Sequence, residues 1–189
     1  MARGLAQNGL VILDRDGVIN RDSPQFVKST DEWVPLPGSI DAIAALARAG
    51  FTVAVASNQS GLARGLFDRR ALGAMHRKLR RLVANATGRI DRIVVCPHGP
   101  DDGCACRKPN PGLLLRLGRF YDTSLAGVPV IGDSLRDLEA ARRANARPIL
   151  VRTGNGDKTE ESLPAAFGAV EVYDDLAEAA AAIITEVAR

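Results

Sequence analysis

The segment Leu10-Val-Ile-Leu-Asp-Arg-Asp-Gly17 joins a short apolar run to two aspartates and a glycine. Four apolar residues in succession predict a strand that is buried on both faces of a sheet. The carboxylates of Asp14 and Asp16 project to the same side of an extended chain, so they can share a divalent cation. Gly17 lets the backbone turn sharply after them. Taken alone, the pattern fits an acidic loop without a ligand equally well.

Short apolar runs alternate with segments of helical spacing along the whole chain. The runs predict strands at 10–13, 52–56, 93–95, 128–131, 148–151 and 169–173. Helical spacing predicts helices at 39–50, 69–86, 111–121, 135–146 and 175–188. Ser39 is expected to cap the first helix and Gly50 to end it. Strands that alternate with helices predict a parallel sheet covered on both faces, a doubly wound α/β fold, in a single domain over residues 1–189.

The composition limits the classes of function. The chain has 189 residues, of which 46% are hydrophobic and 25% charged, as in an ordinary folded domain. Its net charge of +3 suits an anionic small molecule but is low for a nucleic-acid-binding protein, and only 4% of its residues are aromatic. We therefore expect no nucleic-acid partner. The basic residues within 77–81 are interpreted as a solvated helix face rather than a polyanion site.

The sequence also predicts where the protein resides. No run of 18 apolar residues occurs, and residues 1–9 contain no apolar stretch. We therefore expect no membrane span, no secretory signal and a cytoplasmic location. The three cysteines are an odd number, which argues against a closed disulfide framework.

Polar side chains follow the second and fourth predicted strands, at the edge where α/β sheets bind ligands. The second strand is followed by Ser-Asn-Gln-Ser at 57–60, where a hydroxyl and loop N–H groups can hold phosphate oxygens. An ordinary turn is the alternative. The fourth strand is followed by Asp133, which can complete a magnesium site with the two aspartates of the first strand. Asp137 fits equally a helix-capping role with Ser134 and a supporting role behind the site.

The three cysteines and a histidine lie within the segment 96–106. The candidate ligands are Cys96, His98, Cys104 and Cys106. Three thiolates and one imidazole form a closed tetrahedral set, which predicts a structural zinc ion. Free thiols beside a surface histidine are the alternative. Arg107 and Lys108 follow the last ligand directly, so a zinc ion there would fix a loop with two cations; two solvated surface charges are the plainer interpretation of this pair.

The order of these motifs resembles that of the haloacid dehalogenase superfamily. The matching parts are Asp-x-Asp-Gly at 14–17, Ser57 after the second strand, Lys108 before the fourth, and Gly-Asp-x-x-x-Asp at 132–137. Within that superfamily, the segments 14–20, 58–65, 96–98 and 104–112 are similar to those of the D-glycero-D-manno-heptose 1,7-bisphosphate 7-phosphatases. These bacterial enzymes supply heptose for lipopolysaccharide cores or related surface glycans. The histidinol-phosphate phosphatases share the zinc loop and are the alternative family.

The resemblance implies a role for each motif. Asp14 would be the nucleophile that forms an aspartyl-phosphate, and Asp16 the general acid and later the general base. Mg²⁺ would be bound by the side chains of Asp14 and Asp133 and by the main-chain carbonyl of Asp16. Ser57 and Lys108 would hold the oxygens of the transferred phosphoryl group.

The substrate is expected to be a small sugar bisphosphate. Neither 17–51 nor 58–92 has room for a cap domain, so specificity should come from the loops at 20–37, 58–67 and 97–109. Arg107 is the candidate for binding the second phosphate, because its guanidinium matches phosphate in a bidentate manner. Sugar hydroxyls are expected to contact Asp22, Asn58, Gln59 and Ser60.

One residue departs from the pattern of the heptose phosphatases, and other functions are possible for the same motifs. Ser134 stands where some heptose phosphatases carry a lysine that touches substrate, which affects the contact but not the reaction. An open site without a cap also admits a 3′-phosphorylated polynucleotide, although the few aromatic residues oppose this. An inactive binding module stabilised by zinc is the non-enzymatic alternative. We expect the protein to be a monomer.

Overall fold

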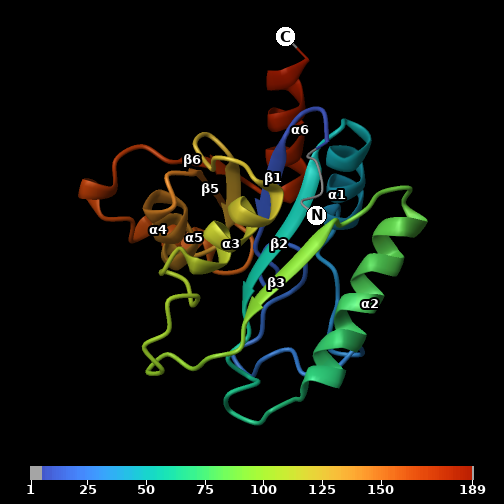
Figure 1. Ribbon diagram of the computed structural model, residues 1–189, viewed down its shortest axis with the longest axis vertical. Helices are drawn as coiled ribbons and strands as arrows, with labels where there is room; N and C mark the ends of the chain where they lie inside the picture. Colours follow the sequence, from blue (N-terminus) through green and yellow to red (C-terminus); the bar gives the residue numbers. More distant parts are fainter. Residues whose placement is uncertain (1–5, 189) are drawn as a thin grey trace.

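The computed structural model describes residues 6–188 and is built on a six-stranded parallel sheet in the order β3-β2-β1-β4-β5-β6 (Figure 1). The strands are β1 (Leu10–Leu13), β2 (Thr52–Asn58), β3 (Arg92–Cys96), β4 (Pro129–Gly132), β5 (Arg147–Val151) and β6 (Glu171–Tyr173). Every neighbouring pair of strands runs parallel. The predicted doubly wound α/β fold is therefore confirmed. Residues 1–5, part of the segment considered for a secretory signal, lie outside the described residues.

Helices cover both faces of the sheet (Figure 1). One face carries α1 (Ser39–Arg48), α2 (Arg69–Asn85) and α6 (Leu176–Val187), and the other carries α3 (Gly112–Tyr121) and α4 (Leu135–Arg143). Two short elements, α5 (Gly156–Glu161) and a 3-10 turn (Ala165–Phe167), follow β5. None of the helices in the described part of the chain has both the length and the apolar character that crossing a bilayer requires.

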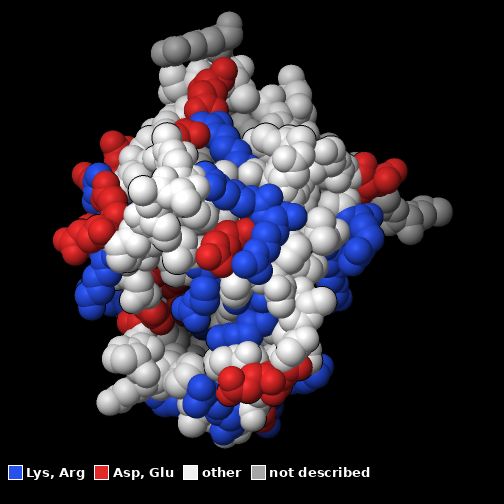
Figure 2. Space-filling view, turned by 90° about the vertical axis from the view of Figure 1, so that its left-hand side faces the viewer, with Lys and Arg blue, Asp and Glu red and all other residues white. Residues whose placement is uncertain are grey.

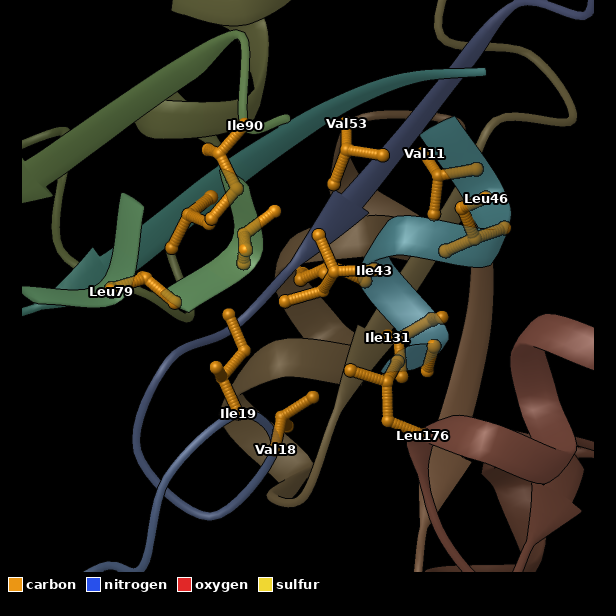
Figure 3. Packing of buried hydrophobic residues seen from close by; sticks show 14 of the residues in the cluster. Val11, Val18, Ile19, Ile43, Leu46, Val53, Leu79, Ile90, Ile131 and Leu176 are labelled. Carbon is orange, nitrogen blue, oxygen red and sulfur yellow. The ribbon is translucent and has the colours of Figure 1, made fainter. Parts of the chain in front are cut away.

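The alternation of side chains along β1 explains why helices are needed on both faces. Val11 and Leu13 pack in the core beneath α1, α2 and α6, which Figure 3 shows around Val11, Ile43 and Leu46. Leu10 and Ile12 point the other way, into the core beneath α3 and α4. A fully buried aliphatic side chain contributes about 1.5–3 kcal/mol. The strand is thus held from both sides, and its carboxyl end has a fixed position.

Most predicted elements are present, with three differences in detail. Gly50 does end the first helix, with a positive φ of 83°, but Ser39 is not its cap. The N-cap is Gly38, and the Ser39 hydroxyl instead donates to the main-chain oxygens of Ile19 and Leu36 at 2.7 and 2.9 Å. Ser39 therefore ties the long loop after β1 to the start of α1. Strand β2 extends two residues beyond the prediction, and the polar helix α5 was not predicted because it lacks apolar spacing.

The basic run in α2 is a solvated face with one exception. The exposed members are Arg77, Arg80 and Arg81. Lys78 is half-buried and donates to the main-chain oxygens of Thr30 and Trp33 at 2.6 and 2.8 Å. This lysine therefore fastens the loop 20–37 to the helix, close to the cavity described next.

Candidate active site

A cavity of about 190 Å³ lies at the carboxyl ends of β1, β2 and β4. Side chains from the loops after these strands and from the loop after β3 converge on it. Its lining includes Asp14, Arg15, Asp16, Asp22, Ser57, Asn58, Gln59, Ser60, Arg107, Lys108, Asp133, Ser134, Arg136, Asp137 and Asn155. The structure thus brings together all the residues that the sequence proposes for catalysis, magnesium and substrate.

The buried amino group of Lys108 lies between two aspartates. Its Nζ is 2.9 Å from Oδ1 of Asp14 and 2.6 Å from Oδ1 of Asp137, and it donates to the main-chain oxygen of Ala56 at 2.9 Å. Burial opposes the charge of Lys108, but Asp137 and Asp14 outweigh it and hold the pKa of the ammonium above its ordinary value. Lys108 is therefore a fixed positive charge beside Asp14.

Asp14 lies half-buried directly after β1. Its Oδ1 accepts hydrogen bonds from the main-chain N–H of Arg15 at 2.7 Å and from Lys108, whereas no described residue donates to Oδ2. Burial raises the pKa of Asp14 to about 7; Lys108 opposes the shift, and the charges of Asp137 and Asp133 increase it. One carboxylate oxygen is thus anchored, and the other accepts no hydrogen bond from the described residues.

Asp133 occupies a space that glycines create. A Cβ on Gly17 would lie 2.1 Å from Oδ2 of Asp133, and one on Gly154 would lie 2.2 Å from it, so neither position accepts another residue. The same Oδ2 accepts hydrogen bonds from the main-chain N–H and the side-chain Nδ2 of Asn155, at 2.8 and 3.1 Å. Burial and the charge of Asp137 raise the pKa of Asp133 to about 6, against the hydrogen bonds from Asn155.

These carboxylates fit a hard divalent cation. Oxygens of Asp14, Asp133 and Asp137 lie within 4.8 Å of one another, and Lys108 is the ammonium that contacts two of them. Oxygen ligands of this charge and density suit Mg²⁺. Asp137 is already engaged, because Lys108 contacts its Oδ1 and Ser134 donates from its main-chain N–H to Oδ2 at 3.1 Å. Asp14 and Asp133 are therefore the side chains available for the ion.

Asp137 performs both of the roles left open by its sequence pattern. Its Oδ2 accepts from the main-chain N–H and the hydroxyl of Ser134, which forms a capping box at the start of α4. Its Oδ1 pairs with Lys108. The start of the helix and the position of the lysine are thus fixed by one carboxylate.

Asp16 is surrounded by hydrogen-bond donors. Arg15 donates from Nε and Nη2 to Oδ1 at 3.0 and 2.7 Å and from Nη2 to Oδ2 at 2.8 Å. Asn20 and Gln59 each donate from the side-chain amide, at 2.9 Å, to Oδ1 and Oδ2 respectively. Burial raises the pKa of Asp16, but the charge and hydrogen bonds of Arg15, with those of Asn20 and Gln59, outweigh it and hold the pKa below its ordinary value.

The polar residues at the end of β2 and directly after it line the cavity and also bond to other residues of the site. The amide of Asn58 is engaged with the main chain of Lys108, and that of Gln59 donates to Asp16 and, at 2.9 Å, to the buried hydroxyl of Ser57. Ser60 also lines the cavity. The two amides thus contact other site residues in addition to lining the cavity.

The side of the cavity toward α4 is positively charged. Arg107 lines it and donates from Nη1 to the main-chain oxygen of His98 at 3.2 Å, and Arg136 lines it as an exposed side chain. Both residues also border a second hollow of about 270 Å³ beside the loop after β3. Figure 2 shows Lys and Arg side chains gathered across this face of the molecule. Asp22 lies on the cavity wall, where its carboxylate accepts from Asn155 at 3.2 Å.

The predicted zinc ligands form one cluster next to this cavity. Sγ of Cys106 lies 3.1 Å from Sγ of Cys96, 3.6 Å from Sγ of Cys104 and 3.3 Å from Nδ1 of His98. All four ligand atoms lie within 4.8 Å of one another. Zn–S bonds of about 2.3 Å place tetrahedral ligands roughly 3.8 Å apart, so the cluster is close to the size of a zinc site.

The cluster also determines where the cationic loop lies. Arg107 bonds to the main chain of His98, and the amide of Asn110 donates to the main-chain oxygen of Cys104 at 2.9 Å. Lys108 lies between these two anchors. The cluster and the cavity are therefore connected through a few residues of one loop.

Several residues of the site were not predicted from the sequence. Arg15 and Asn20 lie inside the quoted motif, yet nothing in their spacing indicates that they contact Asp16. Asn155 follows β5, so the rule that ligands bind at strand ends could have identified it. Arg136 could have been identified as a cation within the Gly-Asp-x-x-x-Asp motif. Phe26 lines the cavity from the loop 20–37, which the sequence indicated as a specificity loop without pointing to this residue.

Known proteins resemble the chain over most of its length. A family model described as HAD-hydrolase-like matches residues 105–179. A D-glycero-beta-D-manno-heptose-1,7-bisphosphate 7-phosphatase of Bordetella bronchiseptica is 56% identical over 179 residues, which are 94% of this chain and 98% of that protein. An enzyme of the same name from Pseudomonas aeruginosa is 54% identical over 175 residues, 93% of this chain and 97% of the relative.

A solved structure agrees with this similarity. The D,D-heptose 1,7-bisphosphate phosphatase from B. bronchiseptica, complexed with magnesium and phosphate, matches with a TM-score of 0.90 and 56% identity. The match covers 94% of this chain and 99% of that one. Since these relatives are 54–56% identical over more than nine tenths of the chain and the solved structure shares its fold, the chain belongs to the family of D-glycero-beta-D-manno-heptose-1,7-bisphosphate 7-phosphatases.

Proposed function

We propose that this protein removes the 7-phosphate of D-glycero-β-D-manno-heptose 1,7-bisphosphate, as its relatives are named for doing. The observation that carries the proposal is the position of Asp14, whose Oδ1 contacts the ammonium of Lys108. Asp133 lies close to it at the end of β4, the strand beside β1 in the sheet. A nucleophile at Asp14, the ammonium of Lys108 and a magnesium site at Asp14 and Asp133 would then share one small cavity, which supports the proposal. The reaction is a phosphoryl transfer, for which positioning and electrostatic stabilisation provide most of the catalysis.

In the first step, a carboxylate oxygen of Asp14 forms a bond to phosphorus as the bond from phosphorus to the sugar oxygen breaks. Asp16 is ionised in the free site, because its donors hold its pKa below the ordinary value, so it takes up a proton from solvent before this step. It then gives that proton to the departing oxygen, and heptose 1-phosphate leaves as an alcohol. The ammonium of Lys108 and the hydroxyl of Ser57 bind the oxygens of the transferred phosphoryl group. The product of this step is an aspartyl-phosphate at Asp14 and an ionised Asp16.

In the second step, Asp16 takes a proton from a water molecule whose oxygen attacks the aspartyl-phosphate. The bond between phosphorus and Asp14 breaks, inorganic phosphate leaves, and Asp14 returns as a carboxylate. Magnesium would be held by the side chains of Asp14 and Asp133 and by the main-chain carbonyl of Asp16. When bound, it neutralises the negative charge shared by the nucleophile and the phosphate.

The substrate outside the reacting phosphate would lie along the cavity wall. Arg107 is our candidate for binding the 1-phosphate, since it stands on the cationic side of the cavity. Asp22 and Ser60 are the candidates for sugar hydroxyls, with Asn58 and Gln59 as contributors. We further propose that the protein acts in the cytoplasm. We also propose that it acts as a monomer, because the residues to which we assign catalysis and substrate binding all line a cavity of one chain.

The test is a kinetic comparison of the purified protein on four substrates with and without Mg²⁺. These are the two anomers of the heptose bisphosphate, histidinol phosphate and a 3′-phosphorylated oligonucleotide. The expected result is Mg²⁺-dependent release of phosphate with the highest kcat/KM for the β anomer of the heptose bisphosphate. A higher value for histidinol phosphate would assign the protein to the alternative activity, and no release from any substrate would contradict a phosphatase function.

A further inference from the structure

Arg15 is a buried arginine between the two aspartates of the first motif. Its side chain is 1% exposed, and it contacts both neighbours. Its main-chain N–H donates to Oδ1 of Asp14 at 2.7 Å, and its guanidinium forms a forked pair with both carboxylate oxygens of Asp16. Arg15 takes no part in the catalytic steps proposed above.

Removing the charged guanidinium of Arg15 from water is unfavourable in free energy, and its packing contacts alone do not compensate for this. A charge withdrawn from water is stable only when it is paired and hydrogen-bonded, and an apolar side chain of similar volume often serves a core equally well. Its Nη1 has no hydrogen-bond partner among the described residues, so the satisfied part of the group is the edge that faces Asp16. The contact with Asp16 is therefore the feature that requires an arginine.

Arg15 also dominates the orientation of the Asp16 carboxylate. Asn20 and Gln59 each provide one donor, whereas Arg15 grips both oxygens from one rigid plane. Two parallel bonds fix the rotation of a carboxylate about its own axis in a way that a single amide donor does not. The side chain of Asp16 is 21% exposed and lines the cavity. The forked pair with Arg15 therefore sets the direction in which its oxygens face the cavity.

We propose that Arg15 is a positioning residue, which acts on the reaction through Asp16 by holding its carboxyl group in line with the departing oxygen and the attacking water. This inference rests on the proposed function of Asp16. The proton moves between Asp16 and the substrate oxygen or water as described above, and Arg15 itself neither gains nor loses a proton. A misaligned Asp16 would slow both proton transfers while leaving Asp14, Lys108 and the phosphate contacts in place.

The chemistry of the leaving group separates this role from a structural one. A sugar alkoxide needs a proton as it departs, whereas a nitrophenolate ion departs without one. General acid catalysis typically contributes about 10²–10⁴-fold. The kcat/KM includes only the steps up to release of the leaving group, so the ratio of kcat/KM for a sugar phosphate to that for p-nitrophenyl phosphate reports on the acid.

The experiment measures this ratio in the wild type and in the variants Arg15→Met, Arg15→Lys and Asp16→Asn. Arg15→Met should lower kcat/KM for the heptose bisphosphate by about 10²-fold and that for p-nitrophenyl phosphate by less than about threefold, a pattern shared with Asp16→Asn. Arg15→Lys, which keeps the charge but not the fork, should recover only part of the loss. With p-nitrophenyl phosphate, kcat of Arg15→Met should fall, with a burst of nitrophenolate, because the second step still needs the base.

Arg147→Met provides a matched control, because Arg147 is an ion-paired arginine on β5, paired with Glu171 and Glu186 away from the cavity. It should leave the ratio at its wild-type value, and urea unfolding should show that all variants compared are folded. Equal losses on both substrates in Arg15→Met, or no loss on either, would overturn the proposal. If the wild type does not turn over the heptose bisphosphate, the function proposed above is wrong, and the same ratio is read on a primary alkyl phosphate that it does hydrolyse.

Discussion

The side-chain amide of Asn58 holds the main chain of Lys108 by two hydrogen bonds. Nδ2 of Asn58 donates to the main-chain oxygen of Lys108, and the main-chain N–H of Lys108 donates to Oδ1 of Asn58, both at 3.0 Å. The end of β2 is thereby joined to the loop that follows the Cys/His cluster. Asn58 thus positions the main chain of Lys108, and the carboxylates of Asp14 and Asp137 position its ammonium.

Replacing Asn58 should therefore disturb Lys108. Asn58→Ala removes both hydrogen bonds and leaves two main-chain groups without a partner, at a cost of about 1–3 kcal/mol for each buried group. We expect kcat to fall roughly 10- to 100-fold if part of that energy is lost in the transition state. Steady-state kinetics with the preferred substrate checks this. A change confined to KM would instead indicate that Asn58 serves mainly as a sugar contact.

Asp14→Asn should abolish turnover without unfolding the protein. An amide cannot act as the nucleophile toward phosphorus, and the substitution removes a buried charge that Asp137 and Asp133 repel. Circular dichroism and thermal unfolding should resemble the wild type, while phosphate release should be undetectable. Steady-state hydrolysis above a small percentage of the wild-type rate would show that another residue attacks phosphorus.

Binding of Mg²⁺ should strengthen with increasing pH. The pKa values of Asp14 and Asp133 are raised to about 7 and about 6, so both carboxyl groups are largely protonated at pH 5 and must lose protons to bind the ion. At pH 8 both are ionised, and their mutual repulsion destabilises the chain without the ion. Saturating Mg²⁺ should accordingly raise Tm more at pH 8 than at pH 5.

Calorimetry gives a second measurement of the same linkage. Titration with Mg²⁺ at pH 6 in buffers of different ionisation enthalpy should reveal proton release. Asp133→Asn, which keeps the size of the side chain but not its charge, should lose most of the Mg²⁺-dependent shift in Tm. A shift that is the same at every pH would contradict the raised pKa values.

Arg107→Ala should discriminate between substrates with one phosphate and those with two. A hydrogen bond to a charged group contributes about 1.5–3 kcal/mol, so kcat/KM for the heptose bisphosphate should fall roughly 10- to 100-fold. Hydrolysis of heptose 7-phosphate, which lacks the 1-phosphate, should change little. Arg119→Ala, an exposed arginine of α3 outside the cavity lining, is the matched control. Equal losses on both substrates would instead assign Arg107 to the phosphate that is cleaved.

Zinc and magnesium should prove separate in function. Thiolate and imidazole ligands select zinc, whereas carboxylates select magnesium. The purified protein should carry about one zinc ion per chain, because a closed four-ligand site holds one ion. Removal of added Mg²⁺ should stop turnover reversibly. Cys104→Ser or zinc chelation should lower activity by loosening the loop that holds Lys108, although no catalytic group has been changed.

Elemental analysis combined with metal-titrated kinetics checks both statements. Proteolysis in the segment 97–109 should become faster after chelation if zinc fixes this loop. Full Mg²⁺-dependent activity in a protein without zinc would show that the cluster is not needed for catalysis.

The sequence by itself predicted the fold because the relevant patterns are local. Apolar runs such as 10–13 reveal a strand buried on both faces, and their alternation with helical spacing indicates a parallel sheet. The rule that ligands bind at the carboxyl ends of strands then selected Asp14, Ser57 and Asp133. The Cys/His cluster that could hold zinc was recognisable for the same reason, because its four residues lie within one short segment and their chemistry is specific.

Only the tertiary structure decided what the individual side chains contact. The sequence placed Asn58 and Gln59 at the site, but it did not indicate that their amides bond to Lys108 and to Asp16 and Ser57. It also gave Ser39 as a helix cap, whereas the hydroxyl holds the loop after β1. An amide or hydroxyl satisfies its hydrogen bonds with whichever partner the fold brings near, and that partner can lie anywhere in the sequence.

The ion pairs and ionisation states of the site were likewise determined by the tertiary structure. Asp137 pairs with Lys108 only because the loops after β3 and β4 meet at one edge of the sheet. Residue type and spacing determine which groups a chain offers at its strand ends. Burial and the distances between charges determine which of them are ionised, paired or free to react, and both are properties of the packed structure.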